Sequence, residues 1–478
     1  MKRSLRRGTL LCAVGVWTTV LGASAVEADG ELPVEVYQTT GTRDFARVQS
    51  SPFTRHFYTD MQPLDVDAAE ERFGYQGLGV SMTDASCWLL NEMPTERRTA
   101  LLQAVFGAEG ANLSFVRLNI GASDYSTALY TYDDTPGDVE MRCFSVARDD
   151  RYLFPMVREA LKVNPSIRLF AAPWSVPGWM KDSGKFVVGN FKDGCEQACA
   201  NYLLAYVRTC QERGFELKAV SVQNEVNLST RGTYPSCVYT AEQEADVAKR
   251  LSAALKAGGF RTGVWIWDNN YDGATNRVMR QLEDAELRAA IGGVAWHSYD
   301  GRETDVYALR KKHPEIGFFH TEMGPSTLPD SGRTERWWCD KVFRALENGC
   351  ETYTGWNLCL TPDGQPLTGP FCCGGLVTVD PGTWDFTFSE QYRVFRHIAP
   401  FVKSGAKVLK VDGAKDGTAT ICFRNPDGTR VLVVGSDGAG AKGTTFGQRP
   451  RLYIKYKGLM KHLPLPARTW SLTTVLFR

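Results

Sequence analysis

The stretches LKAVSVQNE (residues 217–225) and IGFFHTEMG (residues 316–324) share one pattern, a short apolar run followed by two polar residues and a glutamate. Short apolar runs of this kind are typical of strands buried on both faces of a parallel sheet. Six further runs along the chain have the same form, apolar first and polar or aromatic at the end. They are GLGVSMTDAS (77–86), SFVRLNIGAS (114–123), IRLFAAPWS (167–175), TGVWIWDNN (262–270), GGVAWHSYD (292–300) and TYTGWNLCL (352–360).

Amphipathic stretches with helical periodicity separate these runs, for example residues 94–107, 152–163, 199–214 and 244–259. Several of them close with Gly or Asn, as expected at a helix C-terminus. Strands that alternate with helices predict βαβ units and a parallel sheet. Eight such units predict a closed (β/α)8 barrel, with an open doubly wound sheet as the alternative.

The residues that end the runs favour the barrel. A barrel gathers the carboxyl ends of all eight strands into one mouth, whereas an open sheet leaves several of them far from any shared crevice. One of these ends, the Asp-Asn-Asn of residues 268–270, also suits a turn. The eight strand-end residues are Asp84, Asn119, Trp174, Glu225, Asp268, His297, Glu322 and Trp356.

The alternation of predicted strands and helices is absent at both ends of the chain. Residues 395–478 contain strand-like segments such as TRVLVVGS and RLYIKYKG, separated by Asp-Gly and Gly-rich turns. Residues 26–70 also contain short strand-like pieces, and chain ends often meet in one domain. We therefore expect an α/β protein, a (β/α)8 TIM barrel over residues 71–394, with an appended all-β sandwich domain formed by residues 395–478 and the N-terminal strands of 26–70.

The first 25 residues have the layout of a secretory signal peptide. A basic MKRSLRR segment precedes the apolar stretch 9–25, which ends in the small-residue sequence Ala23-Ser24-Ala25. The alternative, an uncleaved anchor, needs a longer apolar run. We expect cleavage after Ala25 and a secreted or periplasmic protein with no membrane span in the mature chain.

Composition excludes several function classes. The formal net charge of +1 provides no field that would attract nucleic acid or an anionic membrane. Of 13 cysteines, 12 remain after the signal peptide, so disulfide bonds are expected although the sequence leaves their connectivity open. No HExxH or paired CxxC motif is present, so we expect no metal and no cofactor. The role of the adjacent Cys372 and Cys373 and the oligomeric state stay open.

Two of the strand ends carry glutamates, Glu225 in VQNEV and Glu322 in FHTEMG. A lone glutamate is usually a surface residue or an ion-pair partner, but these two follow buried strands and face one mouth. Opposed carboxylates suit glycoside hydrolysis, in which one acid protonates the leaving oxygen and the other attacks the anomeric carbon. Asn224, directly before Glu225, supplies a donor for the sugar 2-hydroxyl.

The ordered motifs resemble those of glycoside hydrolase family 30, in particular its glucosylceramidase-like branch. The resemblance covers most of residues 75–400, with Val226 where the family usually has proline. Seven segments match in order. They are GLGVSMTDAS, FVRLNIGASDYS with YTYDDTPGD, FAAPWSVPGWMK, QNEVN, AWHSYDG, HTEMG and GWNLCL.

The resemblance implies catalytic roles for two residues, Glu225 as acid/base and Glu322 as nucleophile. It implies that other residues bind substrate or orient these acids, although helix capping, core packing or structural ion pairing could explain several of them. These residues are Asp84, Arg117, Trp174, Asn224, Tyr234, His297, Tyr299 and Trp356.

The expected function is therefore a secreted retaining β-glycosidase that hydrolyses β-linked glucosides, with a carbohydrate or glycolipid as substrate. A β-1,6-glucanase or β-xylosidase of the same family is the first alternative. A carbohydrate-binding protein on an inactive scaffold is another, although such proteins commonly lack one carboxylate. A metal-dependent hydrolase is the third, and the sequence offers no clear ligand set for it.

Overall fold

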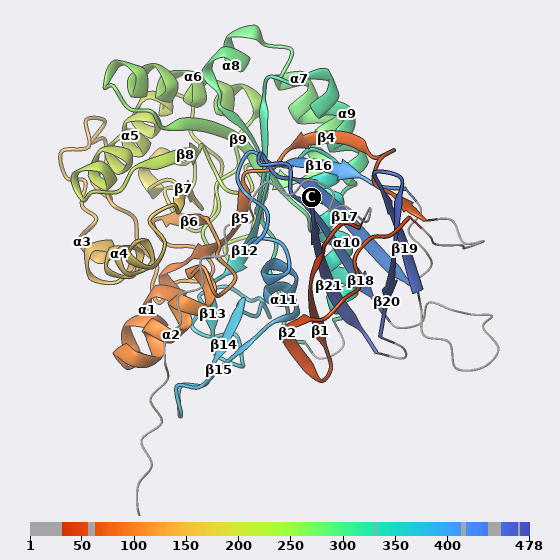
Figure 1. Ribbon diagram of the computed structural model, residues 1–478. Helices are drawn as coiled ribbons and strands as arrows, with labels where there is room; N and C mark the ends of the chain where they lie inside the picture. Colours follow the sequence, from red (N-terminus) through yellow and green to blue (C-terminus); the bar gives the residue numbers. More distant parts are fainter. Residues whose placement is uncertain (1–30, 56–62, 329–330, 413–416, 438–450, 467–468) are drawn as a thin grey trace, which may run out of the picture.

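The computed structural model of the chain describes residues 31–55, 63–328, 331–412, 417–437, 451–466 and 469–478. The predicted signal peptide lies outside these ranges. Eight parallel strands close into a barrel in the order β10-β11-β12-β5-β6-β7-β8-β9, which confirms the TIM barrel over the open sheet (Figure 1). The barrel strands are β5 (Gly77–Met82), β6 (Phe115–Ile120), β7 (Arg168–Pro173), β8 (Leu217–Ser221), β9 (Gly263–Asn270), β10 (Gly293–His297), β11 (Gly317–Glu322) and β12 (Thr352–Asn357).

Helices surround the barrel strands, and several begin at side-chain caps that the sequence supplies. Thr83 accepts a hydrogen bond from the Ser86 amide at the start of α1, and Thr240 with Gln243 forms a capping box at α6. The α-helices are α1 (Asp84–Glu92), α2 (Thr95–Phe106), α3 (Ala147–Arg151), α4 (Leu153–Val163), α5 (Glu196–Glu212), α6 (Ala241–Ala257), α7 (Met279–Gln281), α8 (Ala285–Ala290), α9 (Glu303–Lys312), α10 (Glu335–Glu347) and α11 (Glu390–Arg396).

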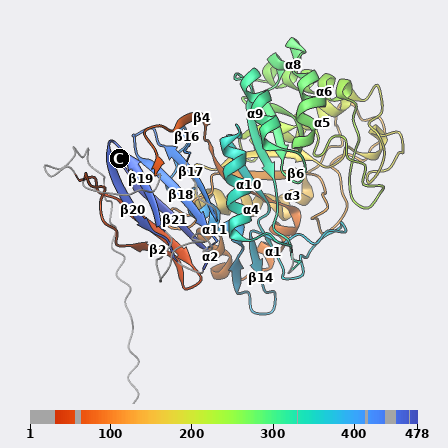
Figure 2. The same cartoon turned by 90° about the vertical axis from the view of Figure 1, so that its right-hand side faces the viewer.

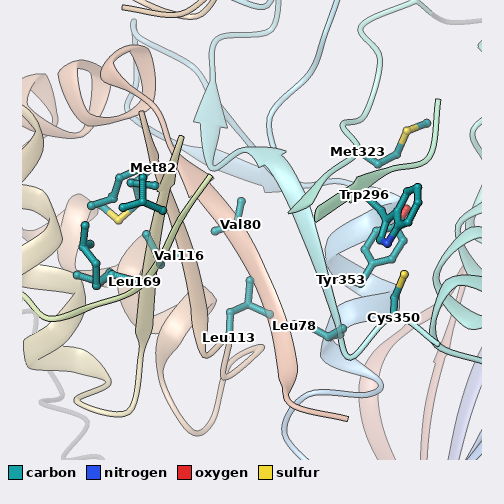
Figure 3. Close-up of a cluster of buried hydrophobic side chains, with 14 of the residues drawn as sticks. Leu78, Val80, Met82, Leu113, Val116, Leu169, Trp296, Met323, Cys350 and Tyr353 are labelled. Carbon is teal, nitrogen blue, oxygen red and sulfur yellow. The ribbon is translucent and has the colours of Figure 1, made fainter. Parts of the chain in front are cut away.

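Strand alternation divides the barrel's apolar side chains into two sets. One set packs outward against the helices, and includes Val80, Val116 and Leu169 (Figure 3). The other set fills the barrel interior as a plug in which Trp265 stacks on Phe319 at 4.2 Å between ring centroids. The plug consists of Phe115, Phe170, Ala219, Trp265, Ala295 and Phe319.

Two further sheets pack face to face beside the barrel, which confirms the appended all-β architecture. A seven-stranded sheet has the order β2-β1-β21-β18-β17-β16-β4, and a three-stranded sheet has the order β20-β19-β3. Their facing side chains, such as Val36, Leu452 and Val475, form a separate apolar core. The strands are β1 (Glu35–Thr40), β2 (Arg43–Val48), β3 (Leu64–Asp65), β4 (Glu70–Gly74), β16 (Lys407–Lys410), β17 (Thr418–Arg424), β18 (Arg430–Ser436), β19 (Arg451–Tyr456), β20 (Leu459–Pro464) and β21 (Ser471–Phe477).

Helices α10 and α11 lie between the barrel and the seven-stranded sheet (Figure 2). His397, directly after α11, is buried between Thr39 of β1 and Thr474 of β21, and both of its ring nitrogens lie 2.8 Å from a threonine hydroxyl. A small sheet of β13 (Cys359–Leu360), β14 (Val377–Val379) and β15 (Phe386–Phe388) follows the last barrel strand. The barrel is thus joined to strands from both ends of the chain.

The cysteines differ from expectation. All twelve in the described ranges carry free thiols, so the expected disulfide bonds are absent from the described part of the chain. Most are buried in the apolar cores, where a free cysteine behaves as a small hydrophobic residue. Within the same ranges, no helix has both the length and the apolar character needed to cross a membrane.

Candidate active site

A polar layer of inward-pointing side chains lies on top of the aromatic plug. Side chains two residues apart on a strand point to the same face of the sheet. The residue two positions after an inward-pointing plug residue therefore also points inward, nearer the carboxyl end of its strand. These residues are Arg117 after Phe115, His297 after Ala295 and Thr321 after Phe319. All three of these polar residues are buried. The strand pattern therefore places charged and polar groups at the floor of the barrel mouth.

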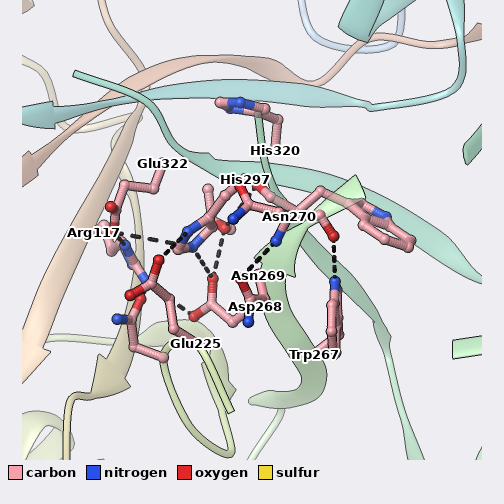
Figure 4. A network of polar contacts seen from close by, with 12 residues as sticks. Arg117, Glu225, Trp267, Asp268, Asn269, Asn270, His297, His320 and Glu322 are labelled. Atoms are coloured by element: carbon pink, nitrogen blue, oxygen red, sulfur yellow. Dashed lines mark hydrogen bonds and ion pairs between the residues drawn. The ribbon is translucent and has the colours of Figure 1, made fainter. Parts of the chain in front are cut away.

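A bulge in β9 brings a carboxylate into this layer. The pairing with β10 skips a residue, since Ala295 pairs with Trp267 but Trp296 pairs with Asn269. Trp267 and Asp268 have positive φ values of 73° and 42°, a costly conformation for residues other than glycine. Trp267 consequently packs outward, and Asp268 points into the barrel (Figure 4).

Arg117 and Asp268 form a buried ion pair at the centre of the network. Arg117 Nη2 donates to Asp268 Oδ2 at 2.9 Å and to Asn224 Oδ1 at 2.7 Å. Asp268 Oδ1 accepts a hydrogen bond from Thr321 at 2.6 Å and lies 3.2 Å from His297 Nε2. Burial alone raises the pKa of Asp268, but the charge of Arg117 and these hydrogen bonds hold it well below its usual range.

Glu322 ends β11 and receives two donors. Arg117 Nη1 donates to Glu322 Oε2, and the Tyr299 hydroxyl donates to Oε1 at 3.1 Å. Burial raises the pKa of Glu322 above its usual value, while His297 and Arg117 oppose the rise and Glu225 adds to it. Both oxygens thus accept hydrogen bonds, an arrangement that suits a carboxylate rather than an acid.

Glu225 follows β8 and faces His297 from the opposite side to Glu322. Its carboxylate lies 3.7 Å from His297 Nδ1, while Glu322 lies 3.9 Å from His297 Nε2. Glu225 has a positive φ of 48°, and its amide donates to the Asp268 carbonyl at 2.9 Å, which ties it to the β9 bulge. No hydrogen bond from the described residues ends on its carboxylate, which is 16% exposed.

His297 is therefore the group that the two glutamates share. Burial lowers the pKa of His297, but the charge of Glu322 and the contacts with Asp268 and Glu225 raise it to about 9. The imidazole is accordingly a cation at neutral pH. Among the described residues, no group of three or more His, Cys, Asp or Glu side chains is arranged to hold a metal ion.

Residues 75–403 match the model of the glycosyl hydrolase family 30 TIM-barrel domain. The chain belongs to glycoside hydrolase family 30. It is 28% identical over 383 residues to an endo-1,6-beta-D-glucanase of Neurospora crassa, covering 75% of this chain and 78% of the relative. It is 26% identical over 381 residues to the lysosomal acid glucosylceramidase of Mus musculus, covering 75% and 73%. A solved endo-beta1,6-glucanase superimposes with a TM-score of 0.81 at 25% identity, covering 93% of this chain and 99% of that one.

The protein is thus a glycoside hydrolase of a family of retaining glycosidases, and its barrel mouth carries the aromatic residues expected beside the acids. Trp174 and Trp356 stack at 5.0 Å between ring centroids. The guanidinium carbon of Arg117 lies 4.7 Å and 5.6 Å from these two rings. Because Asn224 accepts from Arg117 through its oxygen, its amide nitrogen is left to donate elsewhere. Contact of these residues with a sugar stays a prediction.

Asp84 is more constrained than the family resemblance alone implies. Arg148 Nε donates to its Oδ1 at 3.2 Å, and the amide and hydroxyl of Thr127 donate to its Oδ2 at 2.8 Å and 2.9 Å. Thr83, not Asp84, caps α1. A sugar hydroxyl at Asp84 would have to share oxygens already bonded to Thr127 of the β6–α3 loop and Arg148 of α3, so its binding role stays a prediction.

Tyr234 and Tyr299 both lie on loops at the barrel mouth. The Tyr234 ring packs on Phe371 at 5.1 Å between centroids and is almost fully buried. Tyr299 is 39% exposed although its hydroxyl reaches Glu322. The structure thus places nine of the ten predicted site residues at the strand ends or in the loops that follow them, and Arg117 within β6.

Two residues of the polar network were not predicted as site residues from the sequence. Asp268 stood out only as a strand end in a turn-like Asp-Asn-Asn sequence, and Thr321 had no signal beyond its place before Glu322. A third, Asp124, lies in the loop after β6 and is buried close enough for the charges of Glu322 and Glu225 to raise its pKa. No strand-end signal marked Asp124, because it follows the strand by several residues.

Proposed function

We propose that the protein hydrolyses β-linked glucosides with retention, with Glu322 as nucleophile and Glu225 as acid/base. The observation that carries this proposal is the placement of both carboxylates around one buried imidazole, 3.7 Å and 3.9 Å from its two nitrogens. The two carboxylates differ in the hydrogen bonds that they accept. Glu322 accepts from Arg117 and Tyr299, whereas the Glu225 carboxylate has only the longer contact of 3.7 Å with His297 Nδ1 among the described residues and is 16% exposed.

The reaction then proceeds by two displacements. The Glu322 carboxylate attacks the anomeric carbon while the Glu225 carboxylic acid protonates the departing oxygen, which leaves a covalent glycosyl–enzyme ester. Glu225, now ionised, removes a proton from water as the water attacks the same carbon and releases Glu322. The two inversions together retain the configuration.

The charges of the network support a cationic transition state. Arg117 and His297 face the carboxylates of Asp268, Glu322 and Glu225. As Glu225 gives up its proton, negative charge grows on its carboxylate beside those of Asp268 and Glu322, so positive charge at the anomeric carbon develops against negatively charged groups. Fixed charges in a water-poor site stabilise developing charge without reorganisation.

The loops around the mouth favour a substrate with an apolar aglycone. All the large apolar side chains that are strongly exposed in the described residues lie on loops that follow barrel strands at their carboxyl ends, and we call this set the apolar rim. Exposed apolar side chains on the loops that surround a site are available for contact with an apolar part of a ligand. The apolar rim consists of Leu129, Val139, Leu228, Tyr299, Leu328 and Phe371.

We therefore propose a glucosylceramidase-like substrate, a β-glucoside that carries a lipid aglycone. Hydrolysis of β-1,6-glucan is the second candidate, and the similarity to endo-1,6-glucanases over three quarters of the chain favours it. Beyond the first sugar, a polysaccharide continues as a chain of hydroxylated rings. The apolar rim therefore makes fewer apolar contacts with a polysaccharide than with a lipid aglycone.

Substrate panels with rim variants separate the two candidates. Replacing Leu328 and Phe371 together by serine should lower kcat/KM on glucosylceramide in mixed micelles at least tenfold, because about 1–2 kcal/mol of apolar contact is lost for each side chain. The same variant should stay within about twofold of wild type on an aryl β-glucoside. Faster turnover of β-1,6-glucan oligosaccharides than of glucosylceramide, unaffected by the double substitution, would favour the glucanase.

We also propose that the chain is exported and cleaved after Ala25, on the strength of its basic and apolar N-terminal segments. The first residue of the protein recovered from the culture medium or periplasm is then Val26. Retention of residues 1–25 on the recovered protein would contradict the proposal.

A further inference from the structure

Lys181 is a buried cation beside the barrel mouth for which the proposed mechanism has no use. It ends the segment FAAPWSVPGWMK (170–181), in the loop after β7, and is 3% exposed. In the described part of the chain its ammonium group forms no ion pair with a carboxylate. Burying a charge is costly unless other interactions replace the lost water. A buried lysine without a counter-ion must therefore be held by hydrogen bonds.

Three acceptors surround the Lys181 ammonium group, one for each of its N–H bonds. Nζ donates to the Ser175 hydroxyl oxygen at 2.9 Å, to the Phe186 carbonyl at 2.7 Å and to the Ser236 carbonyl at 2.6 Å. An ammonium group has three donors and no acceptor, so its whole hydrogen-bonding capacity is used. Burial lowers the pKa of Lys181 to about 8, which leaves the amine protonated at neutral pH.

The three acceptors belong to the loops that follow two neighbouring barrel strands. Ser175 lies with Phe186 in the loop after β7, whereas Ser236 lies in the loop after β8. Ser175 directly follows Trp174, and Ser236 comes two residues after Tyr234. One ammonium group thus joins the backbone beside two aromatic side chains of the mouth.

The segment around Tyr234 has few other links to the loop after β7. The Tyr234 carbonyl accepts from the Thr230 hydroxyl at 2.7 Å, within the same loop. The Thr230 hydroxyl also lies 3.4 Å from the Val187 carbonyl, in the loop after β7. The bond from Lys181 to Ser236 is much shorter, and charge-assisted hydrogen bonds are stronger than neutral ones. Lys181 therefore provides the stronger of these two links.

Tyr234 is buried beside the catalytic acids. It is 6% exposed, and the charges of Glu225 and Glu322 add to the effect of burial in raising the pKa of its hydroxyl. Its ring belongs to the same apolar cluster as Trp174 and Trp356. A shift of the loop that carries Tyr234 would therefore move one wall of the sugar site.

We infer that Lys181 is a positioning residue, which holds the loop that carries Tyr234 against the loop that carries Trp174 and so fixes the shape of the glycoside site. The inference rests on the proposed glycosidase function and adds to it a residue that touches no substrate. An apolar side chain at this position would leave the acceptors of both loops without their donors. The two loops would then lose the bonds that set their separation beside the mouth.

Removal of the three donors tests the inference. Lys181→Met keeps the length of the side chain, and kcat/KM on an aryl β-glucoside should fall about ten- to hundredfold, because a displacement of about 1 Å in an active site can cost that much. The loss should nearly vanish in a Tyr234→Ala background, since two changes that act through one wall are not additive. Full additivity of the two changes, or wild-type kcat/KM in Lys181→Met, would overturn the inference.

Lys461 of β20 is the matched control, because it is a second buried lysine held by a serine hydroxyl and backbone carbonyls. It is fully buried, its Nζ donates to the Ser50 hydroxyl oxygen at 2.8 Å and to the Ser51 carbonyl at 2.6 Å, and burial lowers its pKa to about 8. Lys461→Met should lower the thermal midpoint by an amount comparable to Lys181→Met, since both leave buried acceptors unpaired. Its kcat/KM, measured well below both midpoints, should stay within about twofold of wild type. Equal kinetic losses in the two variants would assign the effect to stability and overturn a positioning role.

Hydrogen exchange tests the loop itself and needs no turnover. In Lys181→Met the amides of residues 230–239 should exchange at least about tenfold faster than in wild type, whereas Lys461→Met should leave them unchanged. If the wild type hydrolyses no β-glycoside, the proposed function fails, and unchanged exchange in Lys181→Met would separately overturn the inference. If Lys181→Met fails to fold, Ser175→Ala takes its place in the same assays. It removes the acceptor next to Trp174 and should give a smaller loss of kcat/KM in the same direction, which Tyr234→Ala again abolishes.

Discussion

At the scale of single residues, His297 determines the charge of the site. It lies between both catalytic glutamates and contacts Asp268, so its proton screens three carboxylates from one another. Removing that proton would leave Arg117 as the only cation in this group. The residue at the end of β10 is thus an electrostatic link between acids that come from three other strands.

Stability should depend on the protonation of His297. Its pKa rises from about 6.5 in the unfolded chain to about 9 in the fold, so its contribution is complete below pH 6.5 and is lost as pH rises through 9. The loss amounts to about 3 kcal/mol. Urea unfolding between pH 6 and 10 should show this decline in the wild type and a flatter dependence in His297→Asn. Identical slopes in the two proteins would contradict a cationic His297.

Much of the site could be predicted at this scale. The strand-end rule identified Glu225, Glu322 and His297 because each lies at the polar end of a segment that begins as an apolar run. Asp124 could not be found in this way, since its environment is created by loop residues 368 and 369, far away in the sequence. The bonding of Asp84 to Arg148 was likewise invisible, because it depends on how the β6–α3 loop folds back.

At the scale of elements, the bulge in β9 aims Asp268 into the barrel. The amide of Trp267 is buried at this bulge, and Glu244 of α6 accepts its hydrogen bond at 2.6 Å. Glu244 is fully buried and also accepts from Arg277 and Gln281, both at 2.9 Å. The bulge was not predictable from a local pattern, because it depends on the register of β10 and on a side chain from the preceding helix.

Glu244 should accordingly support both stability and turnover. Glu244→Ala leaves the Trp267 amide without its acceptor and Arg277 without its ion-pair partner, although Arg277 still donates to the Tyr239 and Thr240 carbonyls. The change should cost about 3 kcal/mol and lower kcat as the bulge relaxes. Glu244→Gln keeps an oxygen for the Trp267 amide and should retain most of kcat. Urea unfolding and steady-state kinetics measure the two effects. A Glu244→Ala protein with normal kcat would show that the bulge holds its shape without Glu244.

At the scale of the whole molecule, the barrel is joined to strands from both chain ends through buried polar contacts. His397 bonds through its two ring nitrogens to Thr39 and Thr474, so a single imidazole links the end of α11 to β1 and β21. Strand periodicity predicted the barrel and the all-β part. It could not predict this junction, because the junction depends on pairing between residues hundreds of positions apart.

Acid should weaken this junction. Burial lowers the pKa of His397 to about 3, so the neutral form is stable above pH 6.5 and the contribution is lost as pH falls toward 3. The unfolded chain gains the proton first, and the loss approaches about 4 kcal/mol over that range. The thermal midpoint should therefore fall between pH 6.5 and 4, and less steeply in His397→Asn. An equal fall in both proteins would assign the acid sensitivity to other groups.

The assignment of Glu322 as nucleophile is tested most directly by trapping the covalent intermediate. A 2-fluoro β-glucoside with a good leaving group slows release of the glycosyl–enzyme ester, so the labelled residue can be identified by peptide mass spectrometry. The label is expected on Glu322, within the sequence FHTEMG, with Glu225→Ala accumulating it when an activated leaving group is used. A label on Glu225 or any other residue, or turnover of the substrate by Glu322→Ala at a near-normal rate, would contradict the proposed mechanism.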